Sequence, residues 1–393
     1  MTANPAVQQK RNQLIRFSGL ALLLAPYLLY LGFIIWNNRG PIDYETFMEI
    51  GQRLLSGGRV YGVNSYYPMP FVVIFGLFSA LPRPLSMALW LLLPLACVLL
   101  VSGWRPSALL FAPVFGHFIG GQTAVFGMLG LWGYRRNADP DKISGGIWLA
   151  LTLLKPQLGL LPLAYAAVQW WGALRKNKRI PRQAWAWLAS MAVLYLPGFL
   201  ILPDWVAQWL QSPRPLSERA MSGFIPRTLF PGLAGQPLLF WLAWAILSLG
   251  LLALVWQLNH RRLTLDLLVV WGFVASPLLH DYDLIQLVPL LETRLLRWGA
   301  VLLSIPGWLV ILTAYGNDTA WYVFTLIAPG LLALLLYSLR SNDLLGHLPA
   351  VPLPGPCGGD QRSHPYQDSH EDQKPAHRDQ AKADYRKQQP QQQ

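Results

Sequence analysis

The feature that most constrains this chain is a long series of apolar segments separated by short polar connections. Of its 393 residues, 53% are hydrophobic and only 13% are charged. A soluble core does not need this much apolar sequence, whereas repeated crossing of a bilayer does. We therefore predict an all-α, polytopic integral membrane protein with about twelve transmembrane or membrane-embedded helices. The apolar segments are 17–36, 68–81, 85–102, 107–132, 143–154, 157–171, 184–202, 237–258, 263–276, 284–296, 298–313 and 320–339.

Several of these segments are shorter than the ~20 residues that a straight crossing requires. Short segments have to be paired, broken or packed inside protein, because unsatisfied backbone groups are costly in lipid. Gly120-Gly121 splits segment 107–132, and Lys155-Pro156 separates two other apolar runs. We therefore expect broken helices at both of these points.

The net charge of +12 belongs to the apolar part of the chain. From Arg340 onward, basic and acidic residues are equal in number, so the basic excess precedes this residue. Basic residues beside membrane spans set the orientation and contact anionic lipid headgroups. The charge therefore indicates contact with membrane lipids and does not indicate binding of nucleic acid.

The basic residues also predict an orientation. If residues 1–16 are cytoplasmic, the positive-inside rule is satisfied by the basic connections farther along the chain. These connections are 135–142, 175–182, 261–262 and 294–297. Asp43, Lys155 and His280 then share the opposite face, together with the connection 203–236. We expect a multi-pass protein of the inner or plasma membrane whose functional site is extracytoplasmic.

We expect three parts along the chain: a cytoplasmic N-terminus (1–16), a membrane domain (17–339) and a disordered cytoplasmic tail (340–393). The tail is too poor in apolar residues to offset the entropy of ordering. The two cysteines lie one in an apolar segment and one in the tail, so we expect no disulfide framework.

Residues 37–68 form the first long polar stretch after an apolar segment, and they contain Asp43. From Asp43 to Leu55 the apolar residues recur at helical spacing, which predicts an interfacial helix with its apolar side toward lipid. Tyr66 and Tyr67 then return the chain to the membrane, at the headgroup level that tyrosine prefers. Asp43 is either a solvated loop charge or a reacting group at the bilayer surface.

Gly121-Gln122 lies within the segment 107–132. This dipeptide is either a simple helix break or a source of a functional amide, which needs a partner within the membrane. His117 comes five residues earlier, and we interpret it as a core histidine whose hydrogen bonds are satisfied.

Lys155-Pro156-Gln157 lies between two apolar runs. A lysine there is costly unless it snorkels to the interface or faces water or an anion. We hypothesise that Lys155 offers a point charge to a phosphate and that Gln157 donates a hydrogen bond.

The turn 276–283 carries more polar side chains than a turn needs. His280 is able to bind phosphate when protonated, and Asp281 and Asp283 are able to orient it. One histidine with these two aspartates is not a strong metal-ligand spacing, so we expect no metal.

The connection 203–236 adds Arg214, Arg219 and Arg227 as further sources of positive charge. We prefer Arg227 as a phosphate contact, because it lies closest to the next apolar segment.

Taken in order, these short motifs resemble glycosyltransferase family 87, polyprenyl-phosphate-sugar-dependent enzymes of the GT-C class. The resemblance covers most of residues 43–289. It implies a GT-C fold, a mannosyltransferase-like activity on the outer membrane face, and an acid in the first external loop, here Asp43, as the base. The motifs are Ile42-Asp43-Tyr44, Gly57-Gly58 with Val60-Tyr61, Tyr66-Tyr67-Pro68-Met69-Pro70, Gly121-Gln122, Lys155-Pro156-Gln157 and Ser276-Pro277 with His280-Asp281-Tyr282.

We therefore expect transfer of a hexose, mannose by the resemblance, from a polyprenyl-phosphate sugar to a lipid- or glycan-linked acceptor. One base and several cations suffice for this reaction, and a single base predicts inversion at the anomeric carbon. Asp43 would be the base. Lys155, His280 and Arg227 would hold the phosphate, and no cofactor is expected. Further substrate contacts are expected from Tyr44, Tyr66, Tyr67, Gln122, Gln157, Asp281 and Tyr282.

Two other functions fit the same features. A transporter or flippase of a lipid-linked or anionic solute would use the broken helices and Lys155 for anion binding. A scaffold protein would need neither Asp43 nor Lys155. The chain has no nucleotide-binding Gly-rich loop, which argues against a soluble nucleotide-sugar donor.

Overall fold

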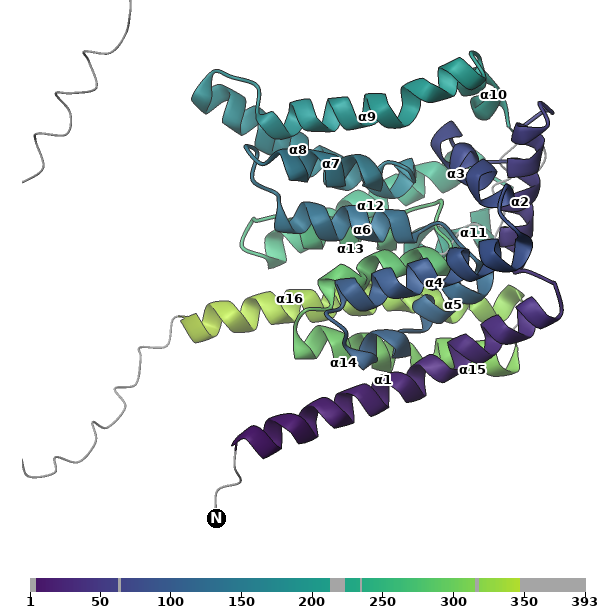
Figure 1. Cartoon of the computed structure of the whole chain (residues 1–393). Coiled ribbons are helices and arrows are strands. Elements are labelled where there is room, and N and C mark those ends of the chain that lie inside the picture. The colour runs from purple at the N-terminus through teal and green to yellow at the C-terminus, as the bar shows by residue number, and fades with distance from the viewer. Residues whose placement is uncertain (1–4, 63–64, 213–222, 234, 315–317, 347–393) are drawn as a thin grey trace, which may run out of the picture. The chain divides into compact units, whose positions relative to one another are not determined.

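The computed structural model describes residues 5–62, 65–212, 223–233, 235–314 and 318–346. These residues form helices joined by turns, with no β-strand among them (Figure 1). The chain divides into two units, 1–345 and 346–393. Almost all of the second unit, and with it most of the predicted disordered tail, lies outside the described residues.

The helices follow the apolar segments, and several of them are short. The elements are α1 (Pro5–Trp36), α2 (Ile42–Leu55), α3 (Met69–Ser79), α4 (Arg83–Val101), η1 (Pro106–Leu110), α5 (Ala112–Gly120), α6 (Val125–Arg136), α7 (Ile143–Thr152), α8 (Pro156–Asn177), α9 (Arg182–Ile201), α10 (Trp205–Gln211), α11 (Phe224–Leu233), α12 (Pro237–Leu258), α13 (Leu265–Ala275), η3 (Asp281–Leu290), α14 (Arg294–Leu303), α15 (Ile305–Thr313), η4 (Asp318–Leu326) and α16 (Ile327–Gly346). The last helix continues past the predicted boundary at Leu339.

Six stretches within the described residues are long and apolar enough to cross a membrane. They are Gln8–Trp36, Arg83–Val101, Arg182–Ile201, Pro237–Leu258, Arg294–Thr313 and Ala320–Ser341. Segment 157–171 lies in α8, a helix of 22 residues that is not among these six. The other predicted segments are short helices or broken ones, as at Gly121 and at Lys155, where the sequence predicts breaks. The chain is therefore all-helical, and its long apolar helices indicate a membrane protein.

The basic connections of the first unit gather at one end of the helices. Arg135, at the end of α6, bonds to Asp266 in α13 at 2.7 Å and to Glu292 at 3.1 Å. Gln183, in α9, donates to the carbonyl of Asn137. The short helix α2 lies at the other end, where it runs across the direction of the long helices (Figure 1). The connections 135–142 and 175–182 therefore lie at the end opposite α2 (Figure 1).

The expected orientation of the apolar side of α2 was wrong. Tyr44 and Phe47 are each only 1% exposed, and they face protein instead of lipid. The ring of Phe47 stacks on Phe75 of α3, with ring centroids 4.5 Å apart, and also contacts Trp90 of α4. Each such aromatic pair adds about 0.5–1.5 kcal/mol beyond its buried area. An apolar helix face cannot by itself distinguish lipid from an apolar protein surface, so the sequence pattern left this undetermined.

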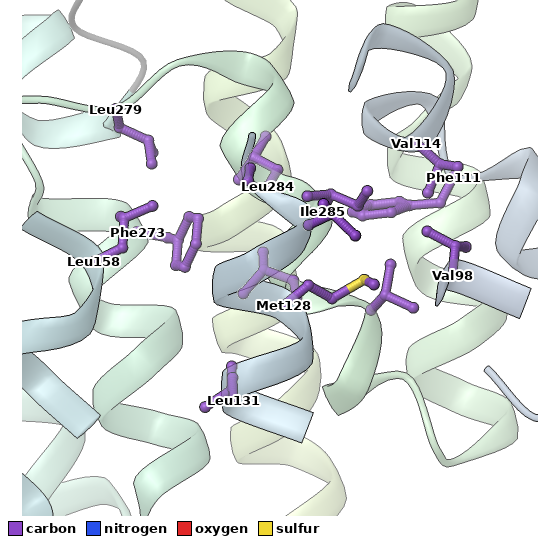
Figure 2. Close-up of a cluster of buried hydrophobic side chains, with 14 of the residues drawn as sticks. Val98, Phe111, Val114, Met128, Leu131, Leu158, Phe273, Leu279, Leu284 and Ile285 are labelled. Carbon is purple, nitrogen blue, oxygen red and sulfur yellow. The ribbon is translucent and has the colours of Figure 1, made fainter. Parts of the chain in front are cut away.

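A second apolar cluster lies among the broken helices. Figure 2 shows Met128 of α6, Phe273 of α13 and Ile285 of η3 within it, together with side chains of α4, α5 and α8. These residues are almost fully buried. The cluster packs together the helices that carry the polar motifs, so these motifs lie on firmly packed elements.

Gly51 is predicted to be required for the contact between α2 and α3. A Cβ atom at Gly51 would overlap the carbonyl oxygen of Phe75 and the hydroxyl of Ser79. Gly51→Ala should lower the free energy of unfolding by about 1–3 kcal/mol, the usual cost of overpacking, measured as thermal stability in detergent. The control is Gly32→Ala in α1, where nothing lies within 4 Å. Equal melting temperatures for the two variants would contradict the prediction.

Candidate functional site

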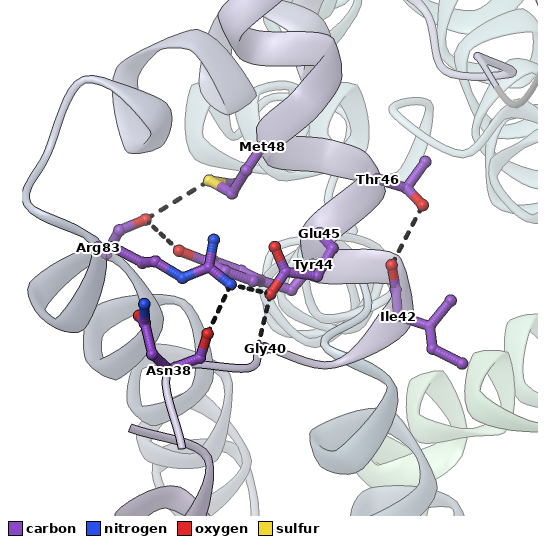
Figure 3. A network of polar contacts seen from close by, with 9 residues as sticks. Asn38, Gly40, Ile42, Tyr44, Glu45, Thr46, Met48 and Arg83 are labelled. Atoms are coloured by element: carbon purple, nitrogen blue, oxygen red, sulfur yellow. Dashed lines mark hydrogen bonds and ion pairs between the residues drawn. The ribbon is translucent and has the colours of Figure 1, made fainter. Parts of the chain in front are cut away.

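Asp43 lies in the first turn of α2, where the helix dipole stabilises negative charge. Its side chain is half-buried, and its Oδ2 accepts a hydrogen bond from Gln122 Nε2. Glu45, two residues later, turns to another side of the helix. There it accepts a hydrogen bond from the backbone of Gly40 and pairs with Arg83 (Figure 3). Asp43 therefore faces the protein and does not point into bulk solvent.

Gln122 reaches Asp43 because the chain breaks between α5 and α6. Gly121 adopts a left-handed conformation with φ of 65°, which a glycine tolerates without strain. The backbone groups released by this break are bonded again. Trp90 Nε1 donates to the Gly121 carbonyl at 2.7 Å, and Val125 N donates to His117 Nε2 at 3.2 Å. His117 is thus a core histidine with a structural hydrogen bond, as interpreted from the sequence.

Lys155 is the centre of a second polar group. It is 6% exposed, and its Nζ lies 2.6 Å from Asp283 Oδ1. The same Nζ lies 5.0 Å from the ring centroid of Tyr282, and this ring stacks on His280. Asp283 also accepts a hydrogen bond from the backbone of His280 at 3.1 Å. We call these four residues, Lys155, His280, Tyr282 and Asp283, the Lys155 cluster.

Asp43 and Asp283 both raise the pKa values of the same two tyrosines, Tyr67 and Tyr282. Burial raises the pKa of Tyr67 above its usual value, and the carboxylates of Asp43 and Asp283 raise it further. The pKa of Tyr282 is raised by burial first, and then by Tyr67, Asp283 and Asp43. Nearby charges shift a pKa only over short distances. The two phenols therefore stay protonated, and each lies near both Asp43 and Asp283.

The remaining predicted site residues lie in different places. Tyr44 is buried and donates its hydroxyl to Ser86 at 2.9 Å, so it is a packing residue. Gln157 is exposed in the first turn of α8. The Tyr66 carbonyl accepts a hydrogen bond from Trp209. Asp281 lies beside Gly116 of α5, since a Cβ atom there would be 3.3 Å from its Oδ2.

Of the three arginines predicted in the connection 203–236, only Arg227 is described. It is 6% exposed, and its guanidinium carbon lies 3.4 Å from the ring centroid of Tyr322. Arg214 and Arg219 lie outside the described residues.

Sequence reasoning identified Lys155, Gln122 and Asp43 separately but missed how they pair. Asp283 was considered only as a residue that orients His280, whereas it is the counter-ion of Lys155. The sequence did indicate that Lys155 has a partner, because a lysine within a membrane protein requires an acid or a carbonyl nearby. The partner of Asp43 had a similar signal, since the amide of Gln122 could not remain unpaired in an apolar segment.

Within the described ranges, no group of three or more His, Cys, Asp or Glu side chains is placed to hold a metal ion. Comparison of the chain with protein-family models, curated proteins and solved structures finds no match. The site is therefore interpreted from its own residues.

Removing one charge of the buried Lys155–Asp283 pair should destabilise the fold strongly. Lys155→Met or Asp283→Leu alone leaves one buried charge unpaired, which costs about 3–5 kcal/mol. The double variant removes both charges and should be clearly more stable than either single variant. Thermal stability of the purified variants measures this coupling.

The control is the exposed pair Glu49–Arg53, whose side chains are 62% and 38% exposed. Breaking it should cost about 0–1 kcal/mol. Additive losses in the Lys155→Met, Asp283→Leu double variant would mean that the two charges do not stabilise one another.

Proposed function

We propose that this chain is a membrane glycosyltransferase that moves a hexose from a polyprenyl-phosphate sugar to a lipid- or glycan-linked acceptor. Mannose is proposed as the sugar because of the resemblance to glycosyltransferase family 87. The single observation that carries the proposal is the position of Asp43. A half-buried carboxylate, held by Gln122, lies near the same two buried tyrosines as Asp283, the partner of Lys155.

The arrangement supports a direct displacement. Asp43 takes the proton of an acceptor hydroxyl while the hydroxyl oxygen attacks the anomeric carbon. The bond from that carbon to the phosphate oxygen breaks, and its electron pair leaves with the polyprenyl phosphate. Lys155 and His280 would stabilise the departing phosphate, and the phenol of Tyr282 is a further donor beside them. One base and one displacement give inversion of the anomeric carbon.

Asp283 supports the proposed role of Lys155. The buried ammonium of Lys155 is paired with a carboxylate oxygen of Asp283 at 2.6 Å, which holds Nζ in place. The ammonium has three donors, so the bond to Asp283 leaves donors for a phosphate. The guanidinium of Arg227 stacks on Tyr322, and its contact with the phosphate stays a prediction.

The same function implies more membrane-embedded elements than the six long stretches. The six long apolar stretches would be joined by the short and broken helices as further membrane-embedded elements, to about twelve in total, in a GT-C-type arrangement. Non-helical backbone is tolerated at membrane depth where protein surrounds it. The site would face the extracytoplasmic side of the inner or plasma membrane, as the basic connections predict.

Asp43→Asn should abolish sugar transfer while leaving the fold intact. Loss of a general base typically costs 10²–10⁴-fold in rate, and we expect a fall of about 10²-fold or more. The measurement uses purified protein, radiolabelled polyprenyl-phosphate mannose and a crude pool of lipid and glycan acceptors. The matched control is Asp204→Asn, an exposed acid beside α10.

Equal transfer by wild type and Asp43→Asn would refute the role of Asp43. If neither protein transferred sugar but both moved a lipid-linked sugar across vesicles, the chain would be a transporter or flippase. A scaffold protein would give neither signal.

Gln122→Leu should lower the turnover number without changing the KM for the donor. The variant removes the hydrogen bond that orients Asp43, and a bond to a charged group is worth about 1.5–3 kcal/mol, which is about tenfold or more in rate. Gln286→Leu, at another buried amide that packs against Gly127 of α6, is the control. A rise in KM with unchanged turnover would assign Gln122 to substrate binding instead.

A further inference from the structure

A cavity of about 480 Å³ lies against α2. Its lining comes from three parts of the chain: the connection before α2, the outer face of α2 and the first residue of α4. The cavity begins at Gly40 and Ile42, directly before Asp43, and its volume lies in the range of ordinary ligand sites. The lining residues are Gly40, Ile42, Glu45, Thr46, Met48, Glu49, Gln52 and Arg83.

One wall of this cavity is held in place by several contacts. Glu45 binds both the backbone of Gly40 and the guanidinium of Arg83, and Arg83 also donates to the Asn38 carbonyl at 3.1 Å (Figure 3). The hydroxyl of Thr46 donates to the Ile42 carbonyl at 3.1 Å. Because these groups already have partners, the wall is shaped before any ligand arrives, which lowers the cost of binding.

The charged and polar groups that line the cavity favour one class of ligand. Glu45 pairs with Arg83 and Glu49 pairs with Arg53, so the charges at the cavity balance and do not favour a phosphate or another anion. The side chain of Gln52 is exposed and supplies both a donor and an acceptor. Carboxylate oxygens, amides and hydroxyls together match the alternating donors and acceptors of a polyhydroxylated ligand.

We propose that this cavity binds the uncharged, polyhydroxylated part of the acceptor, such as the glycan of a lipid-linked or free oligosaccharide. The inference rests on the proposed function, because it treats Asp43 as the base that receives the reacting hydroxyl. The acceptor passes over the first turn of α2, at Gly40 and Ile42, with its reacting end at Asp43. The donor binds at a different place, because its phosphate lies near Lys155 in the proposed mechanism.

The test fills the cavity and measures binding separately from transfer. Mannotriose binding to the full-length chain in nanodiscs is measured by saturation-transfer difference NMR, for wild type, Thr46→Trp and the control Leu55→Trp. Leu55 is exposed on the same helix and does not line the cavity. We expect at least a tenfold loss of affinity in Thr46→Trp, none in the control, and unchanged melting temperatures.

Transfer from labelled polyprenyl-phosphate mannose is measured in the same samples. Thr46→Trp should raise the KM for the acceptor while hydrolysis of the donor by water stays the same. Undiminished mannotriose binding in Thr46→Trp, or tighter binding of mannose 6-phosphate or spermidine, would overturn the assignment. A wild-type chain that binds mannotriose in this cavity but never consumes the donor would instead overturn the proposed function, and with it the acceptor role.

Discussion

The pairing of Lys155 with Asp283 is the constraint on which the polar part of this structure depends. Charges are rare in a chain that is only 13% charged, and a buried one needs a partner to remain ionised. Lys155 lies between α7 and α8, and Asp283 lies in the first turn of η3, so the pair joins two places where the helical chain is interrupted. Once these interruptions are bonded to one another, Tyr282 and His280 are fixed beside them.

The interruptions themselves explain how an apolar chain builds a polar site. A continuous helix would use its backbone groups internally and would carry Gln122 past the end of α2. The break at Gly121 instead turns the chain, and Trp90 and His117 bond the backbone groups that the break releases. This is the arrangement that lipid demands, because backbone left unpaired at membrane depth is too costly. The breaks between short apolar helices therefore bring the polar side chains of the site together.

Much of the fold could be predicted from the sequence, but the pairings could not. Apolar length and periodicity are local properties, so the helices of the apolar segments, the helix 43–55 and the breaks at Gly121 and Lys155 were visible in the pattern, whereas α10 and α11 lie in the predicted connection 203–236. Asp43 and Gln122 are 79 residues apart, and Lys155 and Asp283 are 128 apart. Contacts at such separations depend on how the helices pack. The same limit explains the wrong orientation of α2, since its apolar side packs on Phe75 and Trp90 and does not face lipid.

The helix α2 is held from three directions, and this determines what it is able to do. Gly51 brings it against α3, Gln122 binds its first turn from one side, and Arg83 binds Glu45 from another. A short amphipathic helix lying on lipid would be free to slide and rotate, and its carboxylate would have no fixed position. Catalytic side chains are positioned more precisely on rigid elements than on mobile ones. Because α2 is anchored to α3, to Gln122 and to Arg83, Asp43 at its first turn has a fixed position.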